Sequence, residues 1–232
     1  MCPSSHGGRR RAVRWVLALL LLPPVLLLGS VEALYRHALA RVGAEPRAPV
    51  PRTDFVFQVL WAAEENGPPR LEPRWPWTLV TRFTRPPAGT RMAEAVARQW
   101  LASRPEQPPP GGLRQGLQRL AVAIWLSRHW SVEELLTAYG EGAWFGGDLH
   151  GLDAAARGYF GKAPGQLALH EAALLAGLPQ SPKRHDPVLH PEAARRRRNL
   201  VLSRLLALRW IAETQFLDAR NQPLLSVNRP IP

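Results

Sequence analysis

The residues best suited to chemistry lie in one stretch, WFGGDLHGLDAAARGYFGK, at positions 144–162. Three of its glycines, Gly146, Gly147 and Gly151, would form a turn through which the backbone can approach a partner closely. Lys162 follows a short predicted helix, where its ammonium group would attract an anion. A tight turn between two helices explains the same residues, and the residue types alone favour that structural interpretation.

The overall charge also points to an anionic partner. The chain has 232 residues, 46% of them hydrophobic, which predicts one compact domain with a good core. Lys and Arg number 30 against 18 Asp and Glu, a net charge of +12. This excess favours phosphates, lipid head groups or nucleic acid as partners, and charge alone does not choose among them.

Cysteine and histidine give no sign of a metal site. The single cysteine, Cys2, precedes the main hydrophobic run, so no disulfide is expected in the rest of the chain. The seven histidines are scattered singly, and none has the spacing of a zinc ligand set. We therefore assign no residue to a metal.

A hydrophobic run near the N-terminus predicts a membrane anchor. Residues 15–31 carry no charge and would span about 25 Å as a helix. Arginines at 9–14 precede the run, which predicts a cytoplasmic N-terminus and an exported remainder. A cleavable signal peptide is the main alternative, and a buried soluble helix would leave the arginines unexplained.

The rest of the sequence predicts a mainly α fold. Ser131 and Glu134 form a capping box that starts a helix, and Gly140 is expected to stop it. Apolar residues at helical spacing predict the other helices, and no strand pattern is long enough for a sheet. The expected helices cover residues 54–65, 90–102, 113–129, 131–139, 167–179 and 191–211.

Three consecutive segments resemble a known family. They are AYGEGAWFGGDLHGLDAAARGYFGK, LALHEAALLAGLPQSPKRHDP and PEAARRRRNLVLSRLLALRWIAETQF. In this order they are similar to the second half of the glycosyltransferase family 51 domain, the peptidoglycan glycosyltransferase of penicillin-binding proteins and monofunctional transglycosylases. The resemblance is strong over residues 120–218 and weaker back to residue 57. It implies a lysozyme-like, all-α domain preceded by one transmembrane helix.

This resemblance suggests a division of the chain. We expect a basic cytoplasmic segment, a transmembrane anchor, a linker, a transglycosylase-like domain and a C-terminal tail at residues 1–14, 15–31, 32–56, 57–220 and 221–232. The localisation implied is the bacterial inner membrane, crossed once, with the domain in the periplasm. Because the sequence ends at Pro232, no transpeptidase domain is expected.

The family's reaction assigns roles to five residues. It joins the acceptor's sugar hydroxyl to the donor's anomeric carbon and expels a polyprenyl pyrophosphate, which requires a carboxylate base and positive charge. The resemblance implies that Glu64 is the base, although a Glu-Glu pair alone is usually solvated surface. It also implies substrate contacts from four further residues, namely Thr90, Arg98, Arg157 and Lys162.

The first half departs from the family pattern. The position of the second functional glutamate falls on Arg119, and a cation cannot bind a metal or orient a proton as a carboxylate does. Glu141 stands where the family has Asn after the Tyr of its fourth motif, and is a candidate compensating carboxylate. The chain is therefore expected to be either a divergent polymerase of lipid-linked disaccharide-peptide precursor or a non-catalytic relative that binds precursor, glycan or a cell-wall synthesis partner.

The resemblance also bounds the cofactors and partners. It allows a divalent cation, as in the family, and implies the lipid-linked precursor, the inner membrane and other cell-wall synthesis proteins as partners. Nucleic acid is not expected, because the arginine run at 195–198 spreads around most of a helix and the domain is exported.

Overall fold

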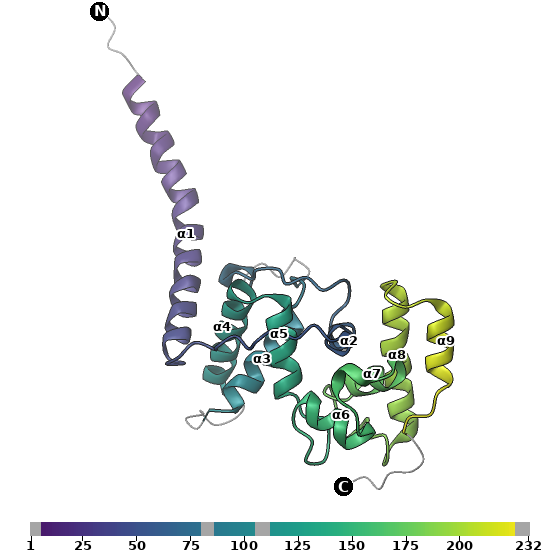
Figure 1. Cartoon of the computed structure of the whole chain (residues 1–232). Helices are drawn as coiled ribbons and strands as arrows, with labels where there is room; N and C mark the ends of the chain where they lie inside the picture. The colour runs from purple at the N-terminus through teal and green to yellow at the C-terminus, as the bar shows by residue number, and fades with distance from the viewer. Residues whose placement is uncertain (1–5, 80–85, 105–111, 226–232) are drawn as a thin grey trace, which may run out of the picture.

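The described part of the chain is built almost entirely of helices (Figure 1). This computed structural model describes residues 6–79, 86–104 and 112–225, so the ends of the expected segments 1–14 and 221–232 lie outside the described residues. In these ranges the only β contact is an isolated antiparallel bridge between Trp144 and His150. The helices are α1 His6–Ala40, α2 Phe55–Glu64, α3 Thr90–Ala102, α4 Leu113–His129, α5 Val132–Gly142, α6 Leu152–Phe160, α7 Leu169–Gly177, α8 Pro191–Ala207 and α9 Glu213–Asn221, with 3₁₀ turns η1 Pro76–Leu79 and η2 Pro164–Gln166.

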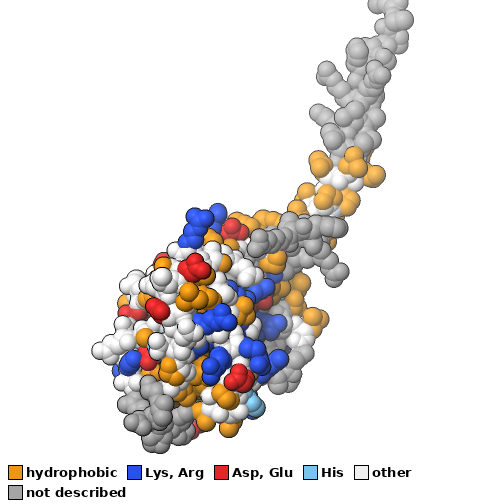
Figure 2. Space-filling model, turned by 90° about the vertical axis from the view of Figure 1, so that its right-hand side faces the viewer, with side chains coloured by type: hydrophobic (Ala, Val, Ile, Leu, Met, Phe, Trp, Pro, Cys, Tyr) orange, Lys and Arg blue, Asp and Glu red, His pale blue; other side chains and the backbone are white. Residues whose placement is uncertain are grey.

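Helix α1 projects away from the body as one long helix (Figure 1). It is longer than the expected 15–31 span and continues through Pro23 and Pro24. Its segment Leu19–Ala40 is long and apolar enough to cross a membrane and is almost entirely unburied. Figure 2 shows hydrophobic side chains around the part of α1 nearest the body. At its foot, Tyr35 is buried against Ile124 of α4, which fixes α1 to the body.

Helix α2 is the centre of the body. It packs against α5 on one side and against α7 and α8 on the other, and Figure 1 shows it between these two groups. Seven of its ten residues are buried, including Trp61 with 1% of its surface exposed. A helix that is apolar all round is stable only inside a core. Its last residue, Glu64, is therefore carried to the surface of the body from a fixed interior helix.

Most of the helices expected from the sequence are confirmed. Helices α3 and α4 begin and end at the expected residues, and Ser131 and Glu134 form the predicted capping box. Helix α5 continues past Gly140 to Gly142, however, because Gly140 packs against Phe57. A Cβ there would lie 2.9 Å from the Phe57 ring, so this glycine serves close packing and does not end the helix.

The C-terminal helices differ more from the expectation. Helix α8 ends at Ala207, four residues before the predicted end at 211, and α9 was not predicted. Helix α9 has a single fully buried residue, Ala219, so its sequence has little apolar periodicity to indicate a helix.

Candidate active site

The two adjacent glutamates have different structural roles. Glu65 is buried, and its Oε1 accepts a hydrogen bond of 3.0 Å from the backbone N–H of Met92. This N–H belongs to the first turn of α3, so Glu65 caps that helix in place of its N-cap residue, Gly89. Burial raises the pKa of the Glu65 carboxyl, and the backbone hydrogen bonds oppose this effect. Of the pair, only the half-buried Glu64 is left for chemistry.

Glu64 is held by a buried tyrosine of α5. The hydroxyl of Tyr139 donates a hydrogen bond of 2.8 Å to Glu64 Oε1, and no donor among the described residues bonds to Oε2. Burial and the negative charge of Glu64 together raise the pKa of Tyr139 well above its ordinary value. The phenol is therefore protonated at neutral pH and acts only as a donor, which orients the carboxylate and leaves its second oxygen open.

Two arginines of α8 fix the end of α2 that carries Glu64. The last carbonyls of a helix have no partner within the helix. Arg197 Nη2 and Arg204 Nη1 each donate to the Ala63 carbonyl oxygen at 2.8 Å, and Arg204 also reaches the Ala62 oxygen at 3.2 Å. Burial lowers the pKa of Arg197, and the charge of Glu64 opposes that shift. Positive charge thus lies close to the carboxylate as well as at the helix end.

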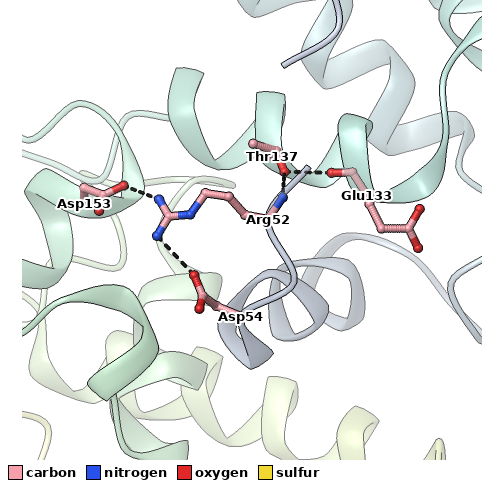
Figure 3. Close-up of polar contacts among 5 residues, drawn as sticks. All are labelled: Arg52, Asp54, Glu133, Thr137 and Asp153. Atoms are coloured by element: carbon pink, nitrogen blue, oxygen red, sulfur yellow. Dashed lines mark hydrogen bonds and ion pairs between the residues drawn. The ribbon is translucent and has the colours of Figure 1, made fainter. Parts of the chain in front are cut away.

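The other end of α2 is fixed by an arginine that precedes it (Figure 3). The guanidinium of Arg52 pairs with Asp153 of α6 and, at 3.1 Å, with Asp54. Its backbone N–H donates to the Thr137 hydroxyl at 2.9 Å, and that hydroxyl donates to the Glu133 carbonyl at 2.8 Å. Helix α2 is therefore tied to α5 and α6 at its start and to α8 at its end.

Tyr139 also lines a cavity of about 560 Å³. Its lining includes Arg98 of α3 and Gln180, with aromatic and imidazole rings from Tyr139, Trp144 and His150. Amide and guanidinium groups beside aromatic ring faces suit a hydroxyl-rich ligand. Glu64 is not a lining residue of this cavity, and Tyr139 connects the two because it lines the cavity and bonds to Glu64.

The sequence-predicted residues do not all meet at this cavity. Arg98 lines it, and the charge of Arg98 acts on Tyr139. Thr90 begins α3, donates from Oγ1 to the Pro87 carbonyl at 2.6 Å and lines a separate cavity with Glu65. Arg157 and Glu141 are exposed on α6 and α5 and are absent from the lining of the Tyr139 cavity.

Lys162 has a structural partner. Its Nζ lies 2.8 Å from both carboxylate oxygens of Glu171, whose side chain is 4% exposed. Glu171 also accepts a hydrogen bond from the Ala168 N–H at the start of α7. Lys162 therefore joins the end of α6 to the start of α7, and with a side chain 41% exposed it still faces solvent.

We expect Lys162→Met to lower the free energy of unfolding by about 1–2 kcal/mol, because a buried carboxylate loses its cation. Urea unfolding followed by circular dichroism measures this change. Arg157→Met is the matched control, since Arg157 is exposed and should change stability by less than about 0.5 kcal/mol. Equal stabilities for the two variants would contradict a structural role for the Lys162–Glu171 pair.

The residues around Glu64 do not suit a divalent cation. Among the residues that the structure describes, no three His, Cys, Asp or Glu side chains come together as a metal site. The groups that act electrostatically on Glu64 or on Tyr139 include the cations Arg98 and Arg197. A single carboxylate offers too few oxygen ligands for a divalent cation, and the charge of Arg197 opposes the binding of one.

Sequence reasoning missed three residues of this arrangement. Tyr139, Arg197 and Arg204 come from α5 and α8, far from Glu64 in the chain, and each bonds to a residue of α2. One local signal in the sequence indicates a shared role of Arg197 and Arg204. They are seven residues apart, so they lie on the same face of α8.

Comparison with known proteins identifies relatives for the second half of the chain. A family model described as Transglycosylase matches residues 96–206. Penicillin-binding protein 1A from Aquifex aeolicus is 39% identical over 112 residues, 48% of this chain and 15% of that protein. Penicillin-binding protein 1C from Escherichia coli is 38% identical over 125 residues, 54% of this chain and 16% of that protein.

These matches cover only part of this chain and a small part of each relative. The chain spans about 15% of the length of these relatives. A crystal structure of penicillin-binding protein 1A from Haemophilus influenzae aligns with 60% of this chain and 17% of that one, at 24% identity and a TM-score of 0.37. The family match includes Arg98, Arg157 and Lys162 but begins after Glu64 and Thr90, so the role of Glu64 depends on geometry alone.

Proposed function

Because residues 96–206 belong to the transglycosylase family, glycosyltransferase family 51, we propose that this chain is a membrane-anchored peptidoglycan glycosyltransferase. It would polymerise lipid-linked disaccharide-peptide precursor into glycan strands at the outer face of the bacterial inner membrane. In this proposal residues 15–31 lie within the anchor, the N-terminus is cytoplasmic, and residues 57–220 form the periplasmic catalytic domain.

The observation that carries the proposal is the geometry around Glu64. Its carboxylate is oriented by Tyr139, has one oxygen without a bonded donor among the described residues, and is connected through Tyr139 to a cavity lined by Arg98. Glu64 would accept the proton of the acceptor's sugar hydroxyl as that oxygen bonds to the donor's anomeric carbon. The bond from the anomeric carbon to the pyrophosphate oxygen breaks, and the leaving group departs with its electron pair toward the cations.

A second function is favoured by one residue. Arg119 stands where the family resemblance places its second functional carboxylate, and Arg119 lines a cavity together with Arg98. A protein that lacked this carboxylate but kept fold, anchor and basic cavity could bind precursor or glycan without turning it over. Other cell-wall synthesis proteins would then be its partners.

A polymerisation assay distinguishes these two functions. The full chain, purified in detergent, would be incubated with labelled lipid-linked disaccharide-peptide, and glycan strands would be separated by gel electrophoresis. Strand formation supports the glycosyltransferase. Retained precursor binding without any strands would overturn it in favour of the non-catalytic binder.

Tyr139→Phe is expected to lower the polymerisation rate by a factor of about 10 to 100, because a hydrogen bond to a charged group contributes about 1.5–3 kcal/mol. Initial rates of strand formation measure this effect.

The control for this variant is Tyr159→Phe. Tyr159 is also buried, and its hydroxyl donates to the Phe145 carbonyl at 3.0 Å, away from Glu64. Burial and the charge of Asp186 raise the pKa of Tyr159 to about 12, so it too is a neutral donor. If the two variants lost the same fraction of the rate, Tyr139 would have no specific effect on Glu64.

A further inference from the structure

Two basic side chains share the carbonyl of Gly177, the last residue of α7. Arg197 of α8 donates a hydrogen bond of 3.2 Å from its Nε to this oxygen. The imidazole of His185, from the loop between α7 and α8, lies against the same carbonyl. A Cβ on Gly177 would come within 2.8 Å of the Arg197 side chain, so α7 and α8 approach closely at this point.

Arg197 connects this carbonyl to the candidate base. Its Nη2 donates to the Ala63 carbonyl at 2.8 Å, one residue before Glu64. The charges of Arg197 and Glu64 also act on each other. One guanidinium group therefore joins the end of α7 to the end of α2, and a change that displaces it from Gly177 also weakens the support of Glu64.

The contact of His185 with this group suits only a neutral ring. Its Nδ1 is buried and has no hydrogen-bond partner among the described residues. A proton on Nδ1 would create a buried N–H group that none of those residues accepts, which is unfavourable. The same proton would add a positive charge close to the guanidinium of Arg197, and the two charges would repel each other.

The charged groups that act on His185 from the described residues are cations. Burial lowers the pKa of His185, and the charges of Arg197 and Arg184 lower it further, while the backbone carbonyl at the end of α7 opposes them. The adjacent acid, Asp186, accepts hydrogen bonds from two backbone N–H groups of its own loop. Since the pKa lies below its ordinary value of about 6.5, His185 is neutral at neutral pH and gains a proton only in acid.

We infer that His185 is a positioning residue for Glu64: the neutral ring keeps Arg197 against the end of α2, and protonation of the ring releases it. His185 is not a lining residue of the Tyr139 cavity, so it acts through Arg197 and takes no part in proton transfer. The stabilising contribution of the neutral ring is present above about pH 6.5 and is lost as the pH falls below that value. The effect on strand formation rests on the proposed function, whereas the effect on α2 belongs to the fold.

Two substitutions reproduce the two states of the ring. His185→Gln keeps an N–H donor for the Gly177 carbonyl and cannot gain a proton, whereas His185→Arg is always charged. At neutral pH we expect His185→Gln to form strands within about threefold of the unaltered rate and His185→Arg to be at least about tenfold slower, because Glu64 is then misplaced. Between about pH 7 and about pH 5 the rate of His185→Gln should fall less than that of the unaltered chain. Initial rates with the full chain in detergent measure both effects.

Hydrogen exchange follows the same contact without requiring any activity. The amides of the last turn of α2, up to Glu64, should lose protection when Arg197 leaves the Ala63 carbonyl. From about pH 7 to about pH 5, after correction for the intrinsic pH dependence of exchange, we expect a loss of at least about fivefold in the unaltered chain and of less than about twofold in His185→Gln. The carboxyl groups of Glu64 and Glu65 are present in both chains, so the difference between the chains isolates His185.

His190 provides the matched control, because it is exposed and lies in the same loop. His190→Gln and His190→Arg should each change strand formation and exchange by less than about twofold. The same pH profile in His185→Gln and the unaltered chain, or the same rate in His185→Arg and His190→Arg, would overturn the inference. If the unaltered chain forms no strands, the proposed function fails and the exchange data decide separately: a loss of protection in acid that depends on His185 keeps its role at α2, and a loss that does not depend on it removes that role.

Discussion

Glu64→Gln is expected to reduce glycan-strand formation by a factor of about 10² to 10⁴, the usual cost of losing a general base. Glutamine keeps the size of the side chain, and its amide oxygen still accepts the Tyr139 hydrogen bond, but it cannot take a proton. The fold should therefore remain while the chemical step slows. Initial rates of strand formation at saturating precursor, together with precursor affinity, measure the loss.

The adjacent residue is a matched control for this variant. Glu65→Gln makes the same chemical change one position away, at a side chain that caps α3 through the Met92 N–H. Its strand formation should stay within a few fold of the unaltered chain. Burial raises the pKa of the Glu65 carboxyl, so above that pKa the charged form lowers the stability of the folded state. The neutral glutamine should therefore cost little stability at neutral pH. Similar rates for the two variants would remove Glu64 as the base.

Arg198→Met is expected to lower the free energy of unfolding by about 3 kcal/mol, the largest stability effect that we expect from a single substitution here. Arg198 is fully buried, and its guanidinium donates to the Arg220 and Gln222 carbonyls at 2.7 Å and to the Pro223 carbonyl at 3.3 Å. These carbonyls end α9, so the variant leaves them without a donor. Urea unfolding gives the size of the loss, and hydrogen exchange of the α9 amides should show where it occurs.

The control lies in the same arginine run. Arg196 is exposed, so Arg196→Met should change the unfolding free energy by less than about 0.5 kcal/mol. Two arginines of the run are buried, Arg197 and Arg198, and two are exposed, Arg195 and Arg196. The buried half of the run therefore has a structural role in α8. Equal destabilisation by both variants would mean that the carbonyl contacts of Arg198 contribute nothing specific.

The buried arginines also explain how Glu64 is kept in place. Arg197 and Arg204 satisfy the carbonyls at the end of α2, while Arg52 ties its start to α6. A short helix held at both ends has little freedom, so the carboxylate at its last residue has a defined position. Precise placement of a base contributes to rate because the reacting groups then need no reorganisation.

Local sequence determined most of the helices and the resemblance to the transglycosylase family. Helices α3 and α4 and the Ser131–Glu134 capping box follow from apolar spacing and side-chain hydrogen bonding within a few residues. The family resemblance depends on consecutive motifs in one order, which a linear chain displays directly. Both kinds of signal act over short distances along the chain, so no tertiary information was needed.

Tertiary structure decided which residues of each pattern serve the site. Glu64 and Glu65 look equivalent in sequence, and only the packing of α2 against α3 and α5 makes Glu65 a cap and turns Glu64 toward Tyr139. Likewise Arg98 and Arg119 share a cavity only because α3 packs against α4. These relations join residues many positions apart, and the burial and electrostatic energies that fix them depend on distances in space, which spacing along the chain does not encode.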